Sequence, residues 1–377
     1  MTGNPTEEAD VSAQQRLISA DSHICEVEAC YEQIDPKFKD RRPLAANDPD
    51  TGAFMRIPDV EMNIPMGALC RAGVPPEKWG KPVTWEELHP AGYDPKARVS
   101  IQEEEGVLAE VLYPSVGMVI CNHDDWDYKK ACFDAYNRWL AEFCEHAPKR
   151  LLGIGMAACR TPEEGVREVA ELKKMGFHGV MLCGDPCFED YHHPAYDALW
   201  EACVDLEMPV NFHILTSRGD MGGAARGPAI INQIMTIRGN QNIITMMILG
   251  AVFERNPKLK VILVENDAGW IPHFGFRMDH AWERHRWWME TGAIQRKPSE
   301  YLMENVYATF QDDYSVKLVL DGLNLERVMW ASDFPHGDGT YPESQGIAAE
   351  MTDGMTAEQR QAILHGNASA LYGVGEA

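Results

Sequence analysis

Five side chains that can bind a metal ion stand at the ends of short apolar runs in this sequence. They are Asp21 and His23 after RLISA, His213 in PVNFH, Glu265 in KVILVE and Asp333 in RVMWASD. Two imidazoles and three carboxylates form the mixed nitrogen and oxygen ligand set that Zn²⁺, Mn²⁺ or Fe²⁺ accepts. If folding brings the ends of these runs together, the sequence predicts a divalent metal site.

A site of this kind supports more than one reaction. A metal ion with an open coordination position lowers the pKa of bound water toward neutrality, which permits hydrolysis. The same ion can hold a substrate carboxylate and a neighbouring oxygen while CO₂ leaves and an acid protonates the remaining carbon. Asp333 and His336, three positions apart in SDFPH, are the predicted catalytic acid–base residues for either reaction.

Each candidate ligand also has a purely structural interpretation. A lone histidine at the end of a strand is more often a hydrogen-bonded core residue than a ligand. Asp21 or Asp333 could cap a following helix, and Glu265 could be the buried partner of Arg277. The metal hypothesis therefore depends on the shared position of the five residues rather than on any one of them.

Eight β-rich apolar runs alternate with amphipathic segments along the chain and would position these ligands. The runs are residues 16–21, 109–115, 151–158, 178–184, 209–214, 260–266, 305–310 and 327–334. Continuously apolar strands indicate a parallel sheet buried on both faces, and eight βα units predict an α/β fold of the (β/α)8 TIM barrel type. In that fold the carboxyl ends of the strands open into one shared mouth, where the ligands would converge.

An open doubly wound sheet is the structural alternative. Such a sheet usually carries a glycine-rich phosphate loop after its first strand, and the stretch DSHICEVE after the first run is not such a loop. The barrel is the preferred interpretation.

One segment interrupts the alternation. Residues 36–95 are rich in Pro, Gly and Asn and show no sustained hydrophobic period. A long irregular insertion in a compact domain is usually functional or disordered, and because this one follows the first strand we expect it to form a lid over the mouth. We expect a single barrel domain over residues 1–377, with residues 1–15 as a disordered leader.

Three further residues are predicted to face the mouth and contact the substrate. Arg160 follows the third run and could pair with a substrate carboxylate, His123 lies in the loop after the second run, and Trp270 would pack at the wall. Each also has an ordinary interpretation, as an exposed residue at a helix start, a solvated loop histidine and a packing residue.

Several stretches of the sequence resemble the amidohydrolase-related family, in the branch that includes aminocarboxymuconate-semialdehyde decarboxylase. The most specific are VFERNPKLKVILVENDAGWIP and ERVMWASDFPHGDGTYPES, and the resemblance runs from about residue 17 to residue 372. It implies a metal-dependent barrel whose relatives include non-oxidative decarboxylases and hydrolases. The implied substrate is a small aromatic or unsaturated carboxylic acid, and the implied assembly is a homodimer or a larger oligomer.

The ligand positions of the family are carried over one by one. Its first-strand His-x-His matches Asp21-Ser-His23, although a register shifted by two would place His23 first and Cys25 second. Glu26, three residues after the histidine, favours the first alignment. The family's remaining ligand positions match His213, Glu265 and Asp333. Two histidines of the family pattern are thus carboxylates here, which favours Mn²⁺ or Fe²⁺ over Zn²⁺.

This carboxylate-rich ligand set leaves two other functions open. It could hold two Fe or Mn ions in place of one and activate oxygen, as a hydroxylase does. Alternatively, the loss of two family histidines could mark a degenerate barrel that serves as a structural subunit of a hetero-oligomer.

Composition excludes other classes of function. The chain has 34 Lys plus Arg against 58 Asp plus Glu, a formal charge of -24, which repels nucleic-acid phosphates and anionic membranes. No apolar run approaches the roughly 20 residues of a membrane span, and the first residues lack the features of a signal peptide. The ten cysteines form no CxxC pair, which predicts reduced thiols and a cytoplasmic location. The sequence therefore predicts an enzyme for a small molecule.

Overall fold

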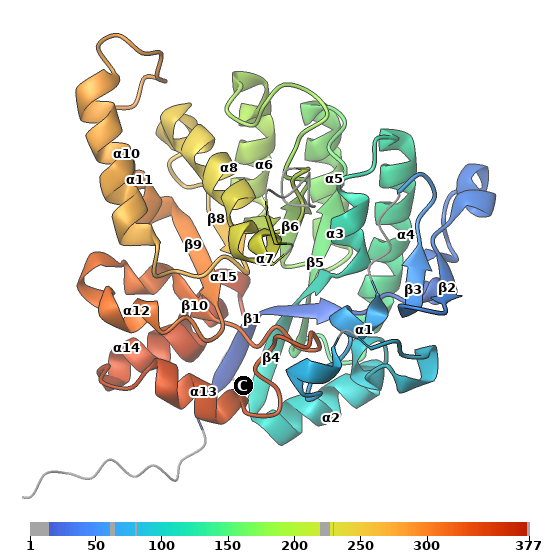
Figure 1. The fold of residues 1–377 in the computed structure, drawn as a ribbon. Coiled ribbons are helices and arrows are strands. Elements are labelled where there is room, and N and C mark those ends of the chain that lie inside the picture. Colours follow the sequence, from blue (N-terminus) through green and yellow to red (C-terminus); the bar gives the residue numbers. More distant parts are fainter. Residues whose placement is uncertain (1–14, 61–64, 80, 219–226, 229, 375–377) are drawn as a thin grey trace, which may run out of the picture.

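The structure is a computed structural model, and it describes residues 15–60, 65–79, 81–218, 227–228 and 230–374. Eight parallel strands form one sheet in chain order, which curls into a nearly closed barrel (Figure 1). They are β1 (Leu17–Ile24), β4 (Val107–Pro114), β5 (Leu151–Ala157), β6 (Gly179–Leu182), β7 (Val210–His213), β8 (Val261–Val264), β9 (Val306–Phe310) and β10 (Val328–Trp330). Each coincides with one of the eight apolar runs, so the barrel prediction is confirmed.

Backbone hydrogen bonds close the barrel between β1 and the chain that follows β10. The amide of His23 donates to the carbonyl of Phe334 at 2.7 Å, and the amide of Asp333 donates to the carbonyl of Asp21 at 3.0 Å. We call this junction the seam. Asp21 and His23 lie on one side of it, in β1, and Asp333 lies on the other side, after β10.

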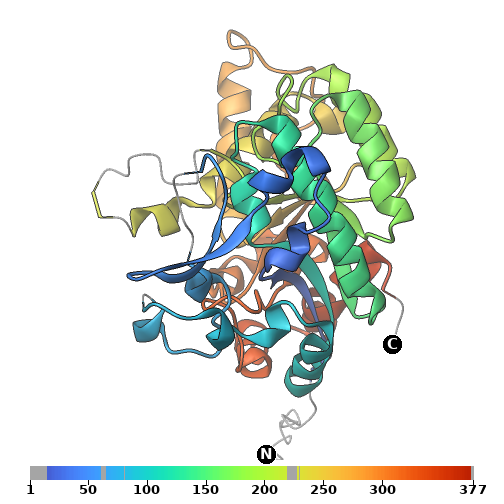
Figure 2. The ribbon, with the colours of Figure 1, turned by 90° about the vertical axis from the view of Figure 1, so that its right-hand side faces the viewer.

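Helices surround the barrel on its outer face (Figures 1 and 2). The main ones are α2 (Pro95–Glu105), α4 (Trp126–Glu145), α5 (Pro162–Lys174), α6 (Asp197–Asp205), α8 (Arg238–Leu249), α10 (Ile271–His285), α11 (Pro298–Asn305), α13 (Ser344–Met351), α14 (Ala357–Gln361) and α15 (Asn367–Tyr372). Local sequence fixes their ends. In α5, for example, the Thr161 side chain accepts from the amide of Glu164, and Pro162 occupies the first turn.

Helix α2 differs from the other helices in the residues that it buries. Its buried residues are Arg98, Gln102 and Glu105, spaced four and three positions apart on one face. This polar stripe faces the barrel, where Arg98 contacts the His23 carbonyl of β1 and the Glu110 side chain of β4.

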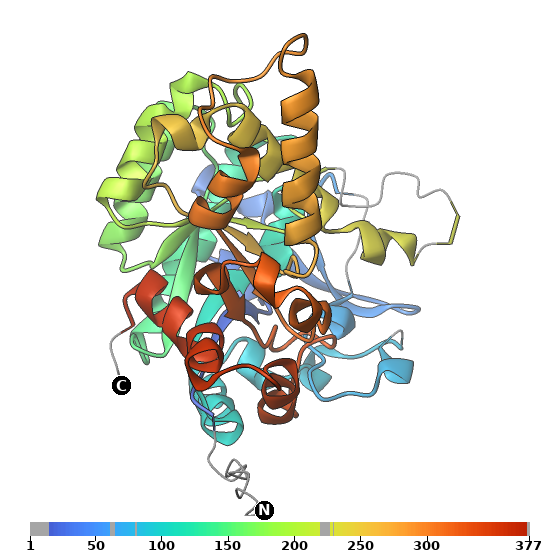
Figure 3. The ribbon, with the colours of Figure 1, turned by 90° about the vertical axis from the view of Figure 1, so that its left-hand side faces the viewer.

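The 36–95 insertion is more regular than its sequence suggests. It contains an antiparallel pair, β2 (Leu44–Asp48) and β3 (Gly52–Arg56), and a short helix, α1 (Met66–Leu69). The pair β2–β3 projects from the same side of the molecule as α7 (Ile231–Met235) (Figures 2 and 3). The lid role remains a prediction.

Backbone hydrogen bonds tie the later part of the insertion to the barrel. The amides of Arg71 and Ala72 both donate to the carbonyl of Pro335, and the amide of Cys25 donates to the carbonyl of Gly92. These contacts place the insertion against the loop that contains Asp333 and His336.

Residues 1–14 of the expected leader lie outside the described residues, and the Gln15 amide donates to Gln345 Oε1. Within the described chain, every helix is too short or too polar to cross a membrane.

Candidate metal centre

The ends of four strands bring the five predicted ligands to one place. Asp21 and His23 lie in β1, His213 ends β7, Glu265 directly follows β8 and Asp333 lies three residues beyond β10. Because side chains alternate along a strand, Asp21 and His23 share one face, and His23 Nε2 lies 3.4 Å from Asp21 Oδ1. His23 Nε2 also lies 3.3 Å from Asp333 Oδ1, and His213 Nε2 lies 3.6 Å from Glu265 Oε2.

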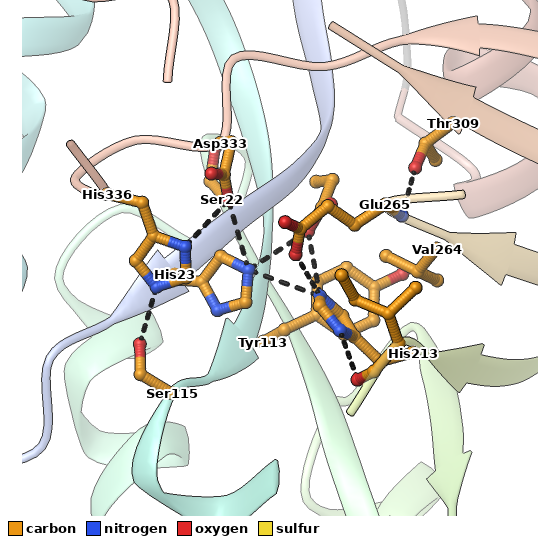
Figure 4. Close-up of polar contacts among 12 residues, drawn as sticks. Ser22, His23, Tyr113, Ser115, His213, Val264, Glu265, Thr309, Asp333 and His336 are labelled. Carbon is orange, nitrogen blue, oxygen red and sulfur yellow. Dashed lines mark hydrogen bonds and ion pairs between the residues drawn. The ribbon is translucent and has the colours of Figure 1, made fainter. Parts of the chain in front are cut away.

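The two histidines present bare nitrogens to each other. His23 Nδ1 lies 3.0 Å from the carbonyl of Pro114, and His213 Nδ1 lies 3.0 Å from the carbonyl of Ile214. A carbonyl only accepts, so each Nδ1 donates its proton, and in the neutral ring that binds a metal ion each Nε2 keeps a lone pair. The two Nε2 atoms are 3.2 Å apart (Figure 4). Backbone carbonyls orient metal-binding histidines in the same way.

The carboxylates around these nitrogens lack hydrogen-bond donors. Both oxygens of Asp21 and both oxygens of Asp333 are buried and accept no well-formed hydrogen bond from the described residues. Their ion-pair partners are the imidazoles of His23, His213 and His336, at 3.0–3.6 Å. Buried polar atoms are normally satisfied, so this cluster of acceptors needs a cation or protons at its centre.

The spacing of the cluster fits one divalent ion. Ligand atoms about 2.1 Å from a common ion lie about 3.0–3.5 Å from each other in tetrahedral or octahedral arrangements. One ligand atom from each of four side chains lies within 4.8 Å of the other three, in His23, His213, Asp21 and Glu265. A second group of the same kind overlaps the first and consists of His23, Glu265, Asp333 and His336.

The pKa values of the clustered side chains also indicate that positive charge is favoured at this position. Burial raises the pKa of Glu265, and the neighbouring Asp333 and Asp21 carboxylates raise it further, to well above its ordinary value. Burial lowers the pKa of His23, but contacts with Asp21 and Asp333 outweigh it and leave this pKa well above its ordinary value. For Asp333, burial raises the pKa, yet His336 and His23 outweigh it and the pKa is lowered.

Two of the candidate ligands have an unusual backbone conformation. Glu265 has φ 53° and Asp333 has φ 54°, in the left-handed region that residues with a Cβ rarely adopt. The amide of Glu265 donates to Thr309 Oγ1 at 2.8 Å, which holds this conformation. Strained backbone held by surrounding structure is concentrated at functional sites.

His336 joins the cluster from the loop after β10, as predicted for a catalytic partner of Asp333. Its Nδ1 lies 3.0 Å from Asp333 Oδ1, and its Nε2 lies 3.0 Å from Ser115 Oγ. Its ring stacks on His23 with centroids 3.9 Å apart. Figure 4 shows His23 between the rings of His336 and His213.

The structure does not bring the three predicted substrate residues into contact with the cluster. The guanidinium of Arg160 pairs with Glu164 and Asp127. His123 Nδ1 accepts from the Asp125 amide, so its Nε2 donates to the carbonyl of Pro58 in the insertion. Trp270 Nε1 donates to the carbonyl of Asn266. A substrate-binding role for Arg160, His123 and Trp270 remains a prediction.

Cys25 and Glu26, which follow β1, both have partners outside the cluster. Cys25 Sγ donates to the carbonyl of Leu69, whereas Asp21 and His23 both belong to a group that could hold a metal ion. Glu26 accepts from the amides of Ser115, Val116 and Gly117, so it binds the start of the loop after β4 in place of an ion.

Residues that support the cluster escaped the sequence interpretation. Ser115, which contacts His336, carries no local signal because a serine after a strand is common. Arg98 carries one weak signal, the polar stripe on α2, where an amphipathic helix would bury apolar side chains.

Comparisons with known proteins agree with this geometry. Residues 116–374 match the family model described as amidohydrolase. The chain is 22% identical over 299 residues to 2-amino-3-carboxymuconate-6-semialdehyde decarboxylase of Dictyostelium discoideum, covering 77% of this chain and 79% of that protein.

Two solved structures share the fold. An amidohydrolase of Mycobacterium avium subsp. paratuberculosis has a TM-score of 0.80 at 22% identity and covers 96% of this chain and 100% of its own. A dihydroxybenzoic acid decarboxylase of Polaromonas, solved with manganese and the inhibitor 2-nitroresorcinol, has a TM-score of 0.66 at 18% identity, with 96% and 98% covered.

Proposed function

Since this chain belongs to the amidohydrolase family, we propose that it is a metal-dependent enzyme that removes CO₂ from a small aromatic or unsaturated carboxylic acid. The observation that carries the proposal is the pair of bare Nε2 atoms of His23 and His213, 3.2 Å apart among buried carboxylates without donors. The names of the relatives support the choice of reaction, because two of those given above are decarboxylases.

His23, His213, Asp21 and Glu265 would hold the ion, with Asp333 beside it. When bound, the ion supplies Lewis acidity that orients the substrate carboxylate and stabilises negative charge next to it. A carboxylate-rich set of this kind suits Mn²⁺ or Fe²⁺ better than Zn²⁺, and the Polaromonas neighbour contains manganese.

Asp333 and His336 would move the proton that the reaction needs. As the carbon–carboxylate bond breaks, its electron pair stays on the ring or alkene carbon, and this carbon takes up a proton while CO₂ departs. The 3.0 Å contact between His336 Nδ1 and Asp333 Oδ1 provides a place where that proton is held before transfer. The Ser115 hydroxyl on the far side of the ring fixes its orientation.

Burial of the cluster would keep bulk water away from the carbanion-like carbon. The side chains of His23, His213 and Asp21 are 0% exposed and that of Asp333 is 1% exposed, whereas the Glu265 side chain is 23% exposed. We therefore expect substrate to enter from the β8 side. The 36–95 insertion, hydrogen-bonded to Pro335, would act as the lid, and the enzyme would work in the cytoplasm as a homodimer or larger oligomer.

The test is release of CO₂ from a panel of hydroxybenzoic, vanillic and unsaturated amino-carboxylic acids by the Mn²⁺-loaded enzyme. Asp333→Asn keeps the shape of the side chain and should reduce turnover at least 1,000-fold, about 4 kcal/mol of transition-state stabilisation, with an unchanged circular dichroism spectrum. Full turnover by this variant would contradict the assigned role.

One observation favours a second candidate, an oxygen-activating enzyme with two ions. The second ligand group, His23, Glu265, Asp333 and His336, shares only two residues with the first. Two metal ions per chain, together with oxygen uptake by the reduced enzyme, would move this candidate to first place.

A further inference from the structure

We propose that Arg98 is a positioning residue of the metal centre, which locks together the two chain segments that supply His23 and Asp333. This inference rests on the proposed function and names the device that prearranges its ligands. It assigns to α2, whose sequence carries no catalytic motif, a direct effect on metal affinity.

The guanidinium of Arg98 spans the seam of the barrel. Arg98 is 0% exposed, and its Nη1 donates to the carbonyl of His23 at 2.8 Å while its Nη2 donates to the carbonyl of Phe334 at 3.0 Å. His23 is itself a candidate ligand, and Phe334 directly follows another. The Phe334 ring also stacks with the guanidinium, whose central carbon lies 4.7 Å from the ring centroid. One planar group thus contacts both sides of the site.

A second set of contacts holds the guanidinium in this orientation. Arg98 Nε donates to Glu110 Oε2 at 2.6 Å, and the Gln102 amide donates to the same oxygen at 2.7 Å. The other oxygen, Glu110 Oε1, accepts from Ser22 Oγ at 3.1 Å, and Ser22 lies between Asp21 and His23. The carboxylate therefore connects the guanidinium to the opposite face of β1.

The hydroxyl network continues across the seam. Ser22 Oγ lies 3.0 Å from Ser332 Oγ, the residue that precedes Asp333. Arg98 thus contacts both ligand segments directly at their backbone carbonyls. Through Glu110 and Ser22 it also reaches both segments from the other side.

The seam needs this support because its backbone is irregular. The pairing of β1 with β4 shifts register between Ser19 and Ser22. Asp333 holds φ 54°, and the Phe334 carbonyl accepts from both the His23 amide and Arg98. Groups around a metal site that orient its ligands typically change metal affinity by 10- to 100-fold when altered.

Arg98→Lys tests the proposal, since a lysine keeps the positive charge beside Glu110 but has no planar fork to bind two carbonyls at once. We expect Mn²⁺ affinity, measured by titration calorimetry, to fall about 10- to 100-fold. The electron paramagnetic resonance spectrum of the bound Mn²⁺ should change as well, because the ligand arrangement becomes less uniform. Unchanged affinity with an unchanged spectrum would overturn the proposal.

Asn305→Ala is the matched control for loss of stability alone. Asn305 is also buried, and its side chain also donates to two backbone carbonyls, those of Pro257 and Leu259, in the chain that leads into β8. This variant should lower the melting temperature and leave Mn²⁺ affinity within twofold of the original protein. An equal loss of affinity in both variants would show that Arg98 acts only through general stability.

A double variant keeps the test valid if Arg98→Lys does not fold. Arg98→Gln combined with Glu110→Gln leaves no uncompensated buried charge and still lacks the fork, so it should show the same loss of affinity. Wild-type affinity in this variant would overturn the inference while leaving the proposed function intact. If the original protein binds no metal ion, the proposed function fails, and the inference fails with it.

Discussion

At the scale of single residues, the most informative feature is the close approach of His23 Nε2 and His213 Nε2. In their neutral forms, His23 and His213 each donate their one ring proton to a backbone carbonyl, so their facing nitrogens cannot bond to each other. Only a cation or an added proton stabilises that contact. Alternation along a strand and the common edge of parallel strands were enough to predict from the sequence that these side chains lie together.

The roles of Ser115 and Arg98 could not be predicted in the same way. Their partners, His336 and the carbonyls of His23 and Phe334, lie between 75 and 236 positions away in the sequence. Nothing in a local pattern encodes a contact between a helix before β4 and a loop after β10. Such contacts become visible only when the barrel closes.

Replacing Glu265 should separate stability from function. Glu265→Gln removes a partly buried carboxylate that is repelled by Asp333 and Asp21, so we expect the melting temperature of the metal-free protein to rise. The same change removes a ligand, so Mn²⁺ affinity should fall at least 10-fold. Differential scanning calorimetry and metal titration measure the two effects. Glu343→Gln, at an exposed position, is the control, and a lower melting temperature for Glu265→Gln would contradict the account.

His178, at the start of β6, should make the fold sensitive to acid. Burial lowers the pKa of His178, and nearby Lys173 lowers it further. A hydrogen bond from Nδ1 to the carbonyl of Tyr372 raises this pKa, but the net shift is downward. The unfolded chain therefore binds a proton first as pH falls below about 6.5, and the free energy of unfolding falls there.

His178→Asn keeps a donor for Tyr372 but cannot take up a proton. Between pH 7.5 and pH 5.5 this variant should lose less stability in urea unfolding than the original protein. The same exchange at exposed His146 shows the effect of losing any one imidazole. Parallel pH profiles for the original protein and His178→Asn would contradict the assignment.

At the scale of elements, strands were easier to predict than the insertion. The eight barrel strands are continuously apolar because both of their faces are buried. β2 and β3 pair only with each other in a ladder, and β2 is only partly buried, so their sequences carry no such pattern. Helix α2 shows the opposite problem, since its buried face is polar. Arg98 and Gln102 bind the Glu110 carboxylate, and Arg98 also binds two backbone carbonyls across the seam.

Packing of the insertion on the loop after β10 can be tested at Gly73. This glycine has φ 75°, and a Cβ there would lie 3.0 Å from the ring of Tyr341. Tyr341 in turn packs against Phe334, with ring centroids 5.3 Å apart. Gly73→Ala should therefore destabilise the protein and increase proteolysis within residues 36–95.

Gly354→Ala is the matched control, because Gly354 has φ 80° and open space around it. It should cost about 1 kcal/mol through its backbone conformation alone, and Gly73→Ala should cost clearly more. Equal costs in urea unfolding would show that the insertion does not pack tightly on this loop.

At the scale of the whole molecule, the candidate metal centre and a large cavity lie at different ends of the barrel strands. The ligands gather at the carboxyl ends of the strands, where (β/α)8 enzymes have their active sites. A cavity of about 730 Å³ is lined instead by residues that precede β6 to β10, including His178, Lys260 and Arg327. None of the five candidate ligands lines this cavity, so it lies apart from the candidate metal centre.

The most direct test of metal binding by His23 and His213 is a crystal structure of the protein grown with Mn²⁺, with anomalous diffraction data collected to locate the ion. We expect a manganese peak about 2.0–2.3 Å from both His23 Nε2 and His213 Nε2, with Asp21 and Glu265 among the oxygen ligands of the ion. A Mn²⁺-saturated crystal with no peak between these two nitrogens would contradict this expectation.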